Sequence, residues 1–507
     1  MSSFSESTKL LERAAAFAQH LEAKQAIITA ELASYESYST AEDEFERSIE
    51  CLLSLDENLH YLGRRVKSVC VFFPLNLPIY TFTLFALIPS LMADHVYLRP
   101  PQVMMPLFRR LLPLLKIEAL YPNIQVCFDS REEFVQQYAA SADVTIFTGG
   151  EKNARRVLLQ LGKDSLFLFN GYGCNPIVAN PDADLELVVK KTVEAKLFNS
   201  GQDCAGPDTI LVHRSIADQF ISMLRIKLDT VKVGDYTDPE VTIGKIMEVS
   251  QLQHLSAFLL KYRLHIVYGG SVDYQKGIVY PTVIVSSLAD QFNYKEFFSP
   301  IFFISILDND QQLSTYFEGP MYVANEMYVL NFGSSAYVDS LSRSIVIPNA
   351  TILDIERGTE EYGGMSLGAS FVASHGRTEA RLILVPREIS KHLEEMETRK
   401  QGKSVRTQKR ICEEVGGAMA RFFGANLVFG FLFGSVAKGK ATDQSDIDTM
   451  IVLEHEDKEQ AARYLEWLKQ YHLDMNMTRD HVYPAEIVTQ KTLDNSLADL
   501  DNLTLSL

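Results

Sequence analysis

Cys204 is a residue that could do covalent chemistry, and it ends the segment FNSGQDC at residues 198–204. A cysteine thiolate attacks carbonyl carbon and forms thiohemiacetal or thioester intermediates. A free cysteine more often just fills space in a core. Its assignment as a nucleophile therefore requires a base, an oxyanion donor and a cofactor site at other positions in the chain.

A second group of candidate residues lies in LFGSVAKGKATDQSDID, at residues 432–448. Gly434 and Ser435 follow an apolar run and can present backbone N–H and hydroxyl groups to a triphosphate. Asp446 and Asp448 alternate along an extended segment, so both carboxylates point to one side. Two carboxylates on one side suit Mg²⁺ ions that bridge phosphates. A solvated acidic turn is the alternative interpretation.

Strand-like and helix-like patterns alternate from about residue 66 to 300, which is typical of parallel α/β domains. The expected strands are VKSVCVFF, DHVYLRP, NIQVCF, VTIFTGG, SLFLFN and TILVH. Residues 5–60 precede them with a helical pattern that predicts two or three surface helices. Prolines interrupt the apolar stretch 69–93. We therefore expect a buried strand, a turn and a helix there, not a membrane span.

The composition limits the classes of partner. A chain of 507 residues exceeds one ordinary core and predicts two to four compact units. The formal charge of −17 disfavours nucleic acid and anionic membranes as partners of the whole molecule. The six cysteines are widely spread without a CxxC pair, which indicates a reducing compartment. The first residues lack the shape of a signal peptide, so we expect a cytoplasmic protein.

Several short motifs occur in the order that is characteristic of one enzyme family. They are PLNLP, LRPPQ, IFTGG, LFNGYGCNP, FNSGQDC, GDYTDP, YPTVIV and EFFSPIFF. Together they resemble the aldehyde dehydrogenase superfamily over residues ~10–395. The resemblance implies a Rossmann-like cofactor domain without GxGxxG, beside an α/β catalytic domain. It also implies an NAD or NADP cofactor and Cys204 as the nucleophile.

The resemblance assigns further roles by position. Asn76 matches the side chain that stabilises the oxyanion, and Glu296 matches the glutamate that holds the nicotinamide ribose. Gly149 and Gly150 stand in the family's pyrophosphate turn. Arg99 and Gln102 stand near the adenine ribose, in place of the lysine and glutamate that are typical there. Without that carboxylate, and with an arginine nearby, a 2′-phosphate is tolerated, which favours NADP slightly.

Asn170 stands where the family has its general-base glutamate. An asparagine cannot take a proton from water, so we expect slow hydrolysis of a thioester. Family branches with asparagine here resemble the CoA-acylating type, which discharge the thioester to a thiol. The implied substrate is an aldehyde or an acyl thioester.

The C-terminal motif resembles the nucleotidyltransferase superfamily of polymerase-β type, in its minimal form. This resemblance implies that Asp446 and Asp448 bind Mg²⁺ and that the nucleotide, ATP being the first choice, binds at Gly434 and Ser435. Asp474, in an expected strand HLDMNM, is the best match for a third carboxylate and a base. Little chain remains to bind the acceptor, so the first domain, another subunit or a partner protein must supply it.

The expected fold class is therefore α/β, followed by a small α+β domain. We expect a cofactor domain at 1–168 with part of 345–395, a catalytic domain at 169–345, a basic linker at 396–410 and a transferase domain at 411–507. Three interpretations stay open. The chain is a bifunctional enzyme, a nucleotidyltransferase on a retired dehydrogenase scaffold, or a regulatory protein that modifies a partner. The oligomeric state is left open.

Overall fold

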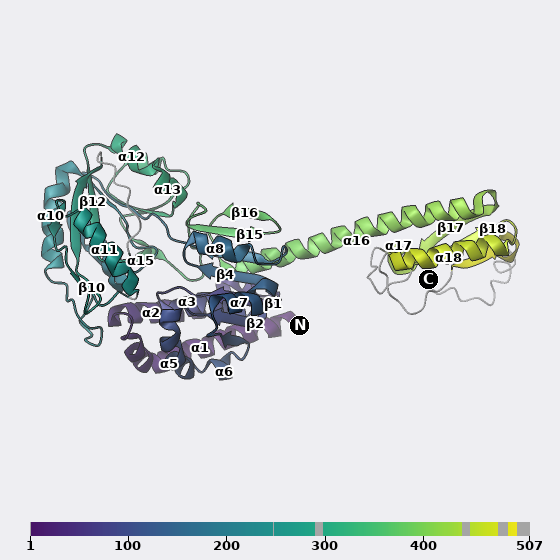
Figure 1. Cartoon of the computed structure of the whole chain (residues 1–507), viewed down its shortest axis with the longest axis horizontal. Coiled ribbons are helices and arrows are strands. Elements are labelled where there is room, and N and C mark those ends of the chain that lie inside the picture. Colours follow the sequence, from purple (N-terminus) through teal and green to yellow (C-terminus); the bar gives the residue numbers. More distant parts are fainter. Residues whose placement is uncertain (1, 247, 289–297, 439–446, 475–484, 494–507) are drawn as a thin grey trace. The chain divides into compact units, whose positions relative to one another are not determined.

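The computed structural model describes residues 2–246, 248–288, 298–438, 447–474 and 485–493 (Figure 1). The chain divides into two compact units, residues 1–393 and 394–507. In the described residues, the first unit holds two seven-stranded sheets and the second holds a three-stranded sheet. The α/β architecture with a small α+β domain, expected from the sequence, is confirmed.

The first sheet has the strand order β16-β15-β5-β4-β1-β2-β3. Five strands pair in parallel, and the hairpin of β15 and β16 joins antiparallel to β5. The strands are β1 (Val66–Phe72), β2 (Ala93–Arg99), β3 (Ile124–Val126), β4 (Val144–Thr148), β5 (Leu166–Asn170), β15 (Ser370–Ser374) and β16 (Arg377–Ala380). The first five coincide with strands that the sequence predicts.

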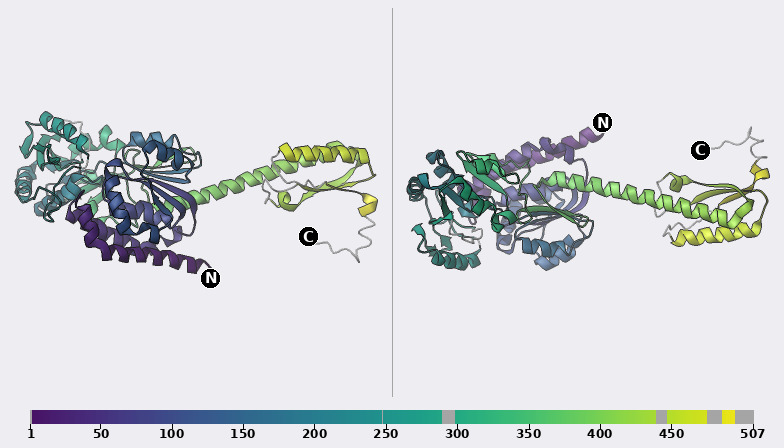
Figure 2. Two further views of the ribbon diagram at one scale, coloured as in Figure 1. Left: turned by 60° about the horizontal axis from the view of Figure 1, so that its bottom comes forward. Right: turned by 90° about the horizontal axis from the view of Figure 1, so that it is seen from above.

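Helices cover both faces of this sheet because alternate residues of its strands are apolar on each side. Val69 and Val71 pack in the core formed with α1 (Ser2–Leu32), α2 (Tyr38–Leu53), α3 (Pro78–Phe82), α4 (Ile88–Ser90) and α5 (Met105–Leu115). Cys70 and Phe72 pack in the opposite core, with α7 (Arg131–Gln137) and α8 (Glu151–Leu158). Figure 2 shows α1, in purple, along the outer side of this layer.

The second sheet has the order β14-β13-β6-β7-β12-β11-β8. Its strands are β6 (Ile177–Ala179), β7 (Ile210–His213), β8 (Ile266–Tyr268), β11 (Thr282–Ser287), β12 (Ile301–Leu307), β13 (Tyr328–Phe332) and β14 (Ile345–Pro348). One face packs on α9 (Leu185–Leu197) and α10 (Arg214–Leu228). The other packs on α11 (Val249–Lys261), α12 (Leu313–Phe317) and α13 (Pro320–Ala324). Cys204 follows α9 in the chain.

The second unit has a sheet of order β17-β18-β19. Its elements are the end of α16 (Val385–Phe423), then β17 (Leu427–Phe433), α17 (Gly434–Ala437), β18 (Asp448–Leu453), α18 (Lys458–Asp474) and β19 (Glu486–Thr489). The basic segment 396–410, expected as a linker, is helical throughout as part of α16. The sequence predicts a strand at HLDMNM. That prediction is wrong at Asp474, which is the last residue of α18.

None of the helices in the described part of the chain combines the length and the hydropathy that a membrane-spanning segment needs. The apolar stretch 69–93 forms β1, a turn and a short helical run, as its prolines predict.

Candidate active site

The segment that leads to Cys204 has a left-handed backbone. Asn199 and Ser200 have φ values of 48° and 56°, and Gly201 follows with φ 76°. A Cβ on Gly201 would lie 2.4 Å from the carbonyl oxygen of Ser299, so a glycine is required there. This turn changes the direction of the chain after α9 ends, and Cys204, which follows it, is partly exposed.

Hydrogen bonds hold this turn in place. The Ser200 hydroxyl bonds to the Tyr236 hydroxyl and accepts the N–H of Gly244 at 3.1 Å. The Asn199 N–H donates to the Thr40 hydroxyl at 3.3 Å, which ties the turn to α2. The nucleophile segment is therefore fixed from two sides.

Asn76 lies in the turn between β1 and α3. Leu77, the next residue, is left-handed with φ 50°. One carboxylate oxygen of the buried Glu44 accepts the N–H groups of Ile79 at 2.8 Å and Tyr80 at 3.1 Å. Glu44 thereby caps the first turn of α3 from outside the helix and fixes the loop that presents Asn76.

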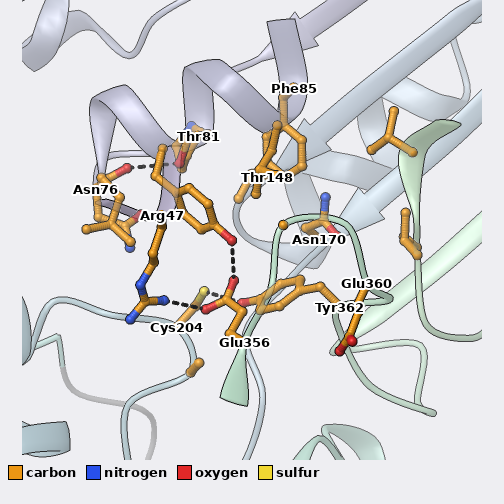
Figure 3. Close-up of a pocket in the computed structure, with 18 of the residues that line it drawn as sticks. Arg47, Asn76, Thr81, Phe85, Thr148, Asn170, Cys204, Glu356, Glu360 and Tyr362 are labelled. Atoms are coloured by element: carbon orange, nitrogen blue, oxygen red, sulfur yellow. Dashed lines mark hydrogen bonds and ion pairs between the residues drawn. The ribbon is translucent and has the colours of Figure 1, made fainter. Parts of the chain in front are cut away.

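Two cavities meet at Cys204. Figure 3 shows the first, which has a volume of about 90 Å³ and mostly apolar walls from α3, α4 and residues 383–386. The second is larger, about 390 Å³. The residues that line both cavities are Pro74, Asn76, Thr148 and Cys204. A carbonyl substrate in the first cavity and a cofactor in the second would therefore meet at the sulfur.

Asn170 lines the first cavity, at the end of β5. It is buried and pairs in register with Thr148 of β4, so both side chains leave the sheet on the same face. Its amide nitrogen finds no hydrogen-bond partner among the described residues. Asn170 and Cys204 therefore line the same cavity.

Gly149 and Gly150 line the second cavity at the N-terminus of α8. Gly149 has φ 142°, and a Cβ on Gly150 would have no heavy atom within 4 Å. Open space beside a helix N-terminus suits a phosphate group. The buried Ala154 lies one turn further along α8 and packs in the core.

The other residues expected at the cofactor have mixed outcomes. Arg99 ends β2 and donates from Nε to the carbonyl of Asp129 at 3.0 Å. Gln102 is exposed at the start of the next helical turn. Pro101, between them in the chain, lines the second cavity. Glu296 lies outside the described residues.

An ion pair that sequence reasoning missed forms part of the first cavity. Arg47 Nη1 lies 2.7 Å from Glu356 Oε2, and the Tyr80 hydroxyl donates to Glu356 Oε1 at 3.3 Å (Figure 3). Burial raises the pKa of Glu356 to about 7 even though Arg47 opposes that rise. Nothing in the local sequence signals the pair, since the two residues are 309 positions apart.

Tyr362 was also missed. Its hydroxyl lies 2.9 Å from the Cys204 sulfur (Figure 3). The sequence contains Tyr362 in the segment EYGGMSLGAS, but its approach to the nucleophile depends on the tertiary fold.

The second unit has its own candidate residues. Gly434 begins α17 with φ 72°, and a Cβ there would lie 1.9 Å from a carboxylate oxygen of Asp448. The Gly434–Ser435 turn therefore packs directly on that carboxylate. Asp446 lies outside the described residues.

Glu486 is an acidic residue that the sequence reasoning overlooked. Glu486 of β19 pairs in register with Met450 of β18. Asp448 lies two positions before Met450 in the same strand, so the side chains of Asp448 and Glu486 lie on one face of the sheet. Asp474, the expected third carboxylate, lies instead at the end of a helix. The signal for Glu486 is an acid inside an apolar strand-like run, AEIVT.

Within the described ranges, no three or more His, Cys, Asp or Glu side chains gather closely enough to hold an ion.

Comparison with known proteins agrees with both motifs. The profile of the aldehyde dehydrogenase family matches residues 13–317, and that of the nucleotidyltransferase domain matches residues 417–499. The chain is 26% identical over 238 residues to a 4,4′-diaponeurosporen-aldehyde dehydrogenase of Staphylococcus aureus, covering 46% of this chain and 51% of that protein. It is 27% identical over 169 residues to a lactaldehyde dehydrogenase of Escherichia coli, and the match covers 32% of this chain and 33% of that protein. It thus spans about half or less of these relatives.

Solved structures share the fold. A succinic semialdehyde dehydrogenase from Streptococcus pyogenes, in complex with NADP⁺, superposes with a TM-score of 0.63 at 18% identity, over 74% of this chain and 90% of that one. HpcC from Thermus thermophilus superposes with a TM-score of 0.64 at 16% identity, over 75% of this chain and 82% of that one. With the family profile matching more than half of its residues, the chain belongs to the aldehyde dehydrogenase family and carries a nucleotidyltransferase domain at its C-terminal end.

Proposed function

We propose that the first unit is an NAD(P)-dependent enzyme that interconverts an aldehyde and an acyl thioester through a covalent intermediate on Cys204. The observation that carries the proposal is the position of Cys204 where two cavities meet, with Asn170 in place of a carboxylate in the substrate-side cavity.

The residues would act as follows. The Cys204 sulfur attacks the carbonyl carbon, and the Asn76 amide donates to the oxygen that becomes negative. The chemistry that a bound dinucleotide would supply is hydride transfer at that carbon. Asn170 has no site for a proton taken from water, so the thioester persists until a thiol attacks it. A CoA-type thiol is the proposed acceptor.

We propose that the dinucleotide binds in the second cavity. Gly150 leaves space at the N-terminus of α8, where a pyrophosphate would lie, and Arg99 and Gln102 flank the wall residue Pro101. We propose NADP or NAD as cofactor, with Arg99 favouring a 2′-phosphate and Glu296 holding the nicotinamide ribose.

Glu356 supports a second candidate, hydrolysis of the thioester. Its pKa of about 7 suits a general base near neutral pH. Both of its oxygens, however, already accept bonds from Arg47 and Tyr80, and a water would have to displace one of them. Thiol transfer therefore remains the first proposal.

For the second unit we propose Mg²⁺-dependent nucleotidyl transfer, with ATP as the nucleotide. Asp446, Asp448 and Glu486 would hold the metal, and Gly434 with Ser435 would contact the triphosphate. Asp448 and Glu486 lie on the same face of the sheet, which supports Glu486 rather than Asp474 as the third metal ligand. The acceptor would come from a partner protein or another part of the chain.

One experiment tests the main proposal. The protein is mixed with short-chain aldehydes and NADP⁺ or NAD⁺, and its intact mass is followed with and without CoA. We expect one acyl group per chain, lost in Cys204→Ser and released by CoA. Continuous turnover without a thiol would favour hydrolysis, and Glu356→Gln would then stop it. Absence of any cofactor binding by calorimetry would mean that the dehydrogenase unit is a retired scaffold.

A further inference from the structure

We propose that Tyr362 is a catalytic hydrogen-bond donor to the Cys204 sulfur. The Tyr362 hydroxyl lies 2.9 Å from Cys204 Sγ, on the substrate side of the pocket (Figure 3). The inference rests on the proposed role of Cys204 as the nucleophile and adds a second residue that touches the reacting atom.

The surrounding structure holds the tyrosine in position. Its backbone N–H and C=O both bond to Ile383, at 3.0 and 2.8 Å. Its ring packs against Tyr328, with centroids 6.3 Å apart, and the Tyr328 hydroxyl accepts the N–H of Gly363 at 3.3 Å. A group fixed in this way is preorganised for the sulfur and needs no rearrangement during the reaction.

The direction of the bond follows from the chemistry of the two groups. A thiolate has no proton to give, so the tyrosine must donate to it. Removal from water and the nearby acidic groups, Cys204 first among them, raise the pKa of Tyr362 well above its usual value, which keeps its proton in place. Asp203 and Glu356 also act on the hydroxyl in that direction.

Electrons and protons balance with the tyrosine unchanged. In the attack, the sulfur forms a bond to the carbonyl carbon, the carbonyl π electrons move to oxygen, and Tyr362 keeps its proton. The thioester would form once a bound NAD(P)⁺ has taken hydride from that carbon while the carbon–oxygen π bond re-forms. An incoming thiolate then attacks the thioester carbon, the bond between that carbon and the Cys204 sulfur breaks, and its electron pair returns to the sulfur. The hydroxyl then donates to the sulfur again and favours its departure.

Tyr362→Phe tests the proposal because it removes the hydroxyl and keeps the ring. The measurement is the rate of Cys204 alkylation by iodoacetamide across pH 6–10 in the full chain, with the modified peptide identified by mass spectrometry. Tyr322→Phe is the matched control, since it removes a buried hydroxyl that bonds to Ser344 and lies outside the lining of both cavities at Cys204. Alkylation needs neither aldehyde nor cofactor, so it reports on Tyr362 even if the proposed reaction fails.

A hydrogen bond to a charged sulfur predicts an alkylation rate at pH 7.5 about tenfold lower in Tyr362→Phe than in the wild type. We also expect the profile to move about one unit to higher pH, and Tyr322→Phe to match the wild type. An equal or faster rate in Tyr362→Phe would overturn the proposal and leave the hydroxyl a packing role. If that variant fails to fold, 3-fluorotyrosine incorporated at position 362 gives the second test, and an unchanged profile there also overturns it.

Discussion

Arg47 and Glu356 form an ion pair in the wall of the pocket that contains Cys204, with 2.7 Å between Arg47 Nη1 and Glu356 Oε2. Both side chains are mostly buried. Arg47 also contacts Asp43 at 2.8 Å. Arg47→Met leaves these carboxylates without their cation. Because an uncompensated buried charge is expensive, we expect the free energy of unfolding to fall by about 3–5 kcal/mol in denaturant titrations.

Two further variants check that prediction. Arg47→Met combined with Glu356→Gln should recover part of the loss, because the buried charge is removed with its partner. Arg65→Met breaks an exposed pair with Asp94 and should cost less than about 1 kcal/mol. Equal losses in Arg47→Met and Arg65→Met would contradict the assigned role of burial.

Stability should depend on pH through Glu44. Burial raises its pKa from 4.5 to about 7, and the neighbouring Glu36 is also raised. Between pH 4.5 and about 7 the folded state therefore binds more protons than the unfolded state. The stabilising contribution of protonated Glu44 is fully present below pH 4.5 and is lost as the pH rises to about 7. The loss reaches about 3 kcal/mol, at 1.36 kcal/mol per pKa unit.

Glu44→Gln isolates that contribution. Its amide oxygen can still accept the N–H groups of Ile79 and Tyr80, so α3 keeps its cap. We expect a flatter profile of unfolding free energy between pH 5 and 8. Glu46→Gln, at an exposed position on the same helix, should keep the wild-type profile. A wild-type slope in Glu44→Gln would assign the pH dependence to other groups.

Asn170→Glu should introduce hydrolysis. The new carboxylate would stand in the cavity with Cys204 and could take a proton from water. We expect deacylation of the Cys204 thioester, measured with p-nitrophenyl acetate, to speed up by about 10²–10⁴-fold. Asn170→Gln has the same length without a base and should not change the rate. The idea fails if the two variants deacylate equally.

Gly201→Ala should damage the nucleophile turn. The left-handed backbone costs a non-glycine residue about 1–2 kcal/mol and the contact with Ser299 about 1–3 kcal/mol more, so thermal unfolding should show that the free energy of unfolding falls by about 2–5 kcal/mol. Gly63→Ala, where a Cβ meets nothing within 4 Å, should stay within about 0.5 kcal/mol. A neutral Gly201→Ala would mean that the turn relaxes without strain.

The proposed metal set of the second unit makes a separate prediction. Glu486→Gln should lower nucleotide transfer from ATP, measured as label incorporated in the presence of Mg²⁺, about as strongly as Asp448→Asn. Asp474→Asn should leave transfer near the wild-type level, since Asp474 ends a helix. The reverse ranking would restore Asp474 as the third carboxylate.

The sequence predicted what depends on local pattern. Apolar, β-rich runs predicted the strands that end at Arg99, Thr148 and Asn170. The motifs singled out Asn76 and Cys204, which line the same two cavities in the structure. Tyr362 and the Arg47–Glu356 pair could not be found in this way, because their contacts join distant parts of the chain. Asp474 was misplaced because an apolar run near a helix end resembles a strand.

The antiparallel hairpin of β15 and β16 has a consequence for synthesis. Ser370 covers the edge of β5 at Asn170, so that edge stays open until the hairpin leaves the ribosome. At about 5–20 residues per second, the roughly 200 intervening residues take about 10–40 s. During that interval the strand LFLFN presents an unpaired edge, so it is a place where the nascent chain could pair wrongly until the hairpin covers it.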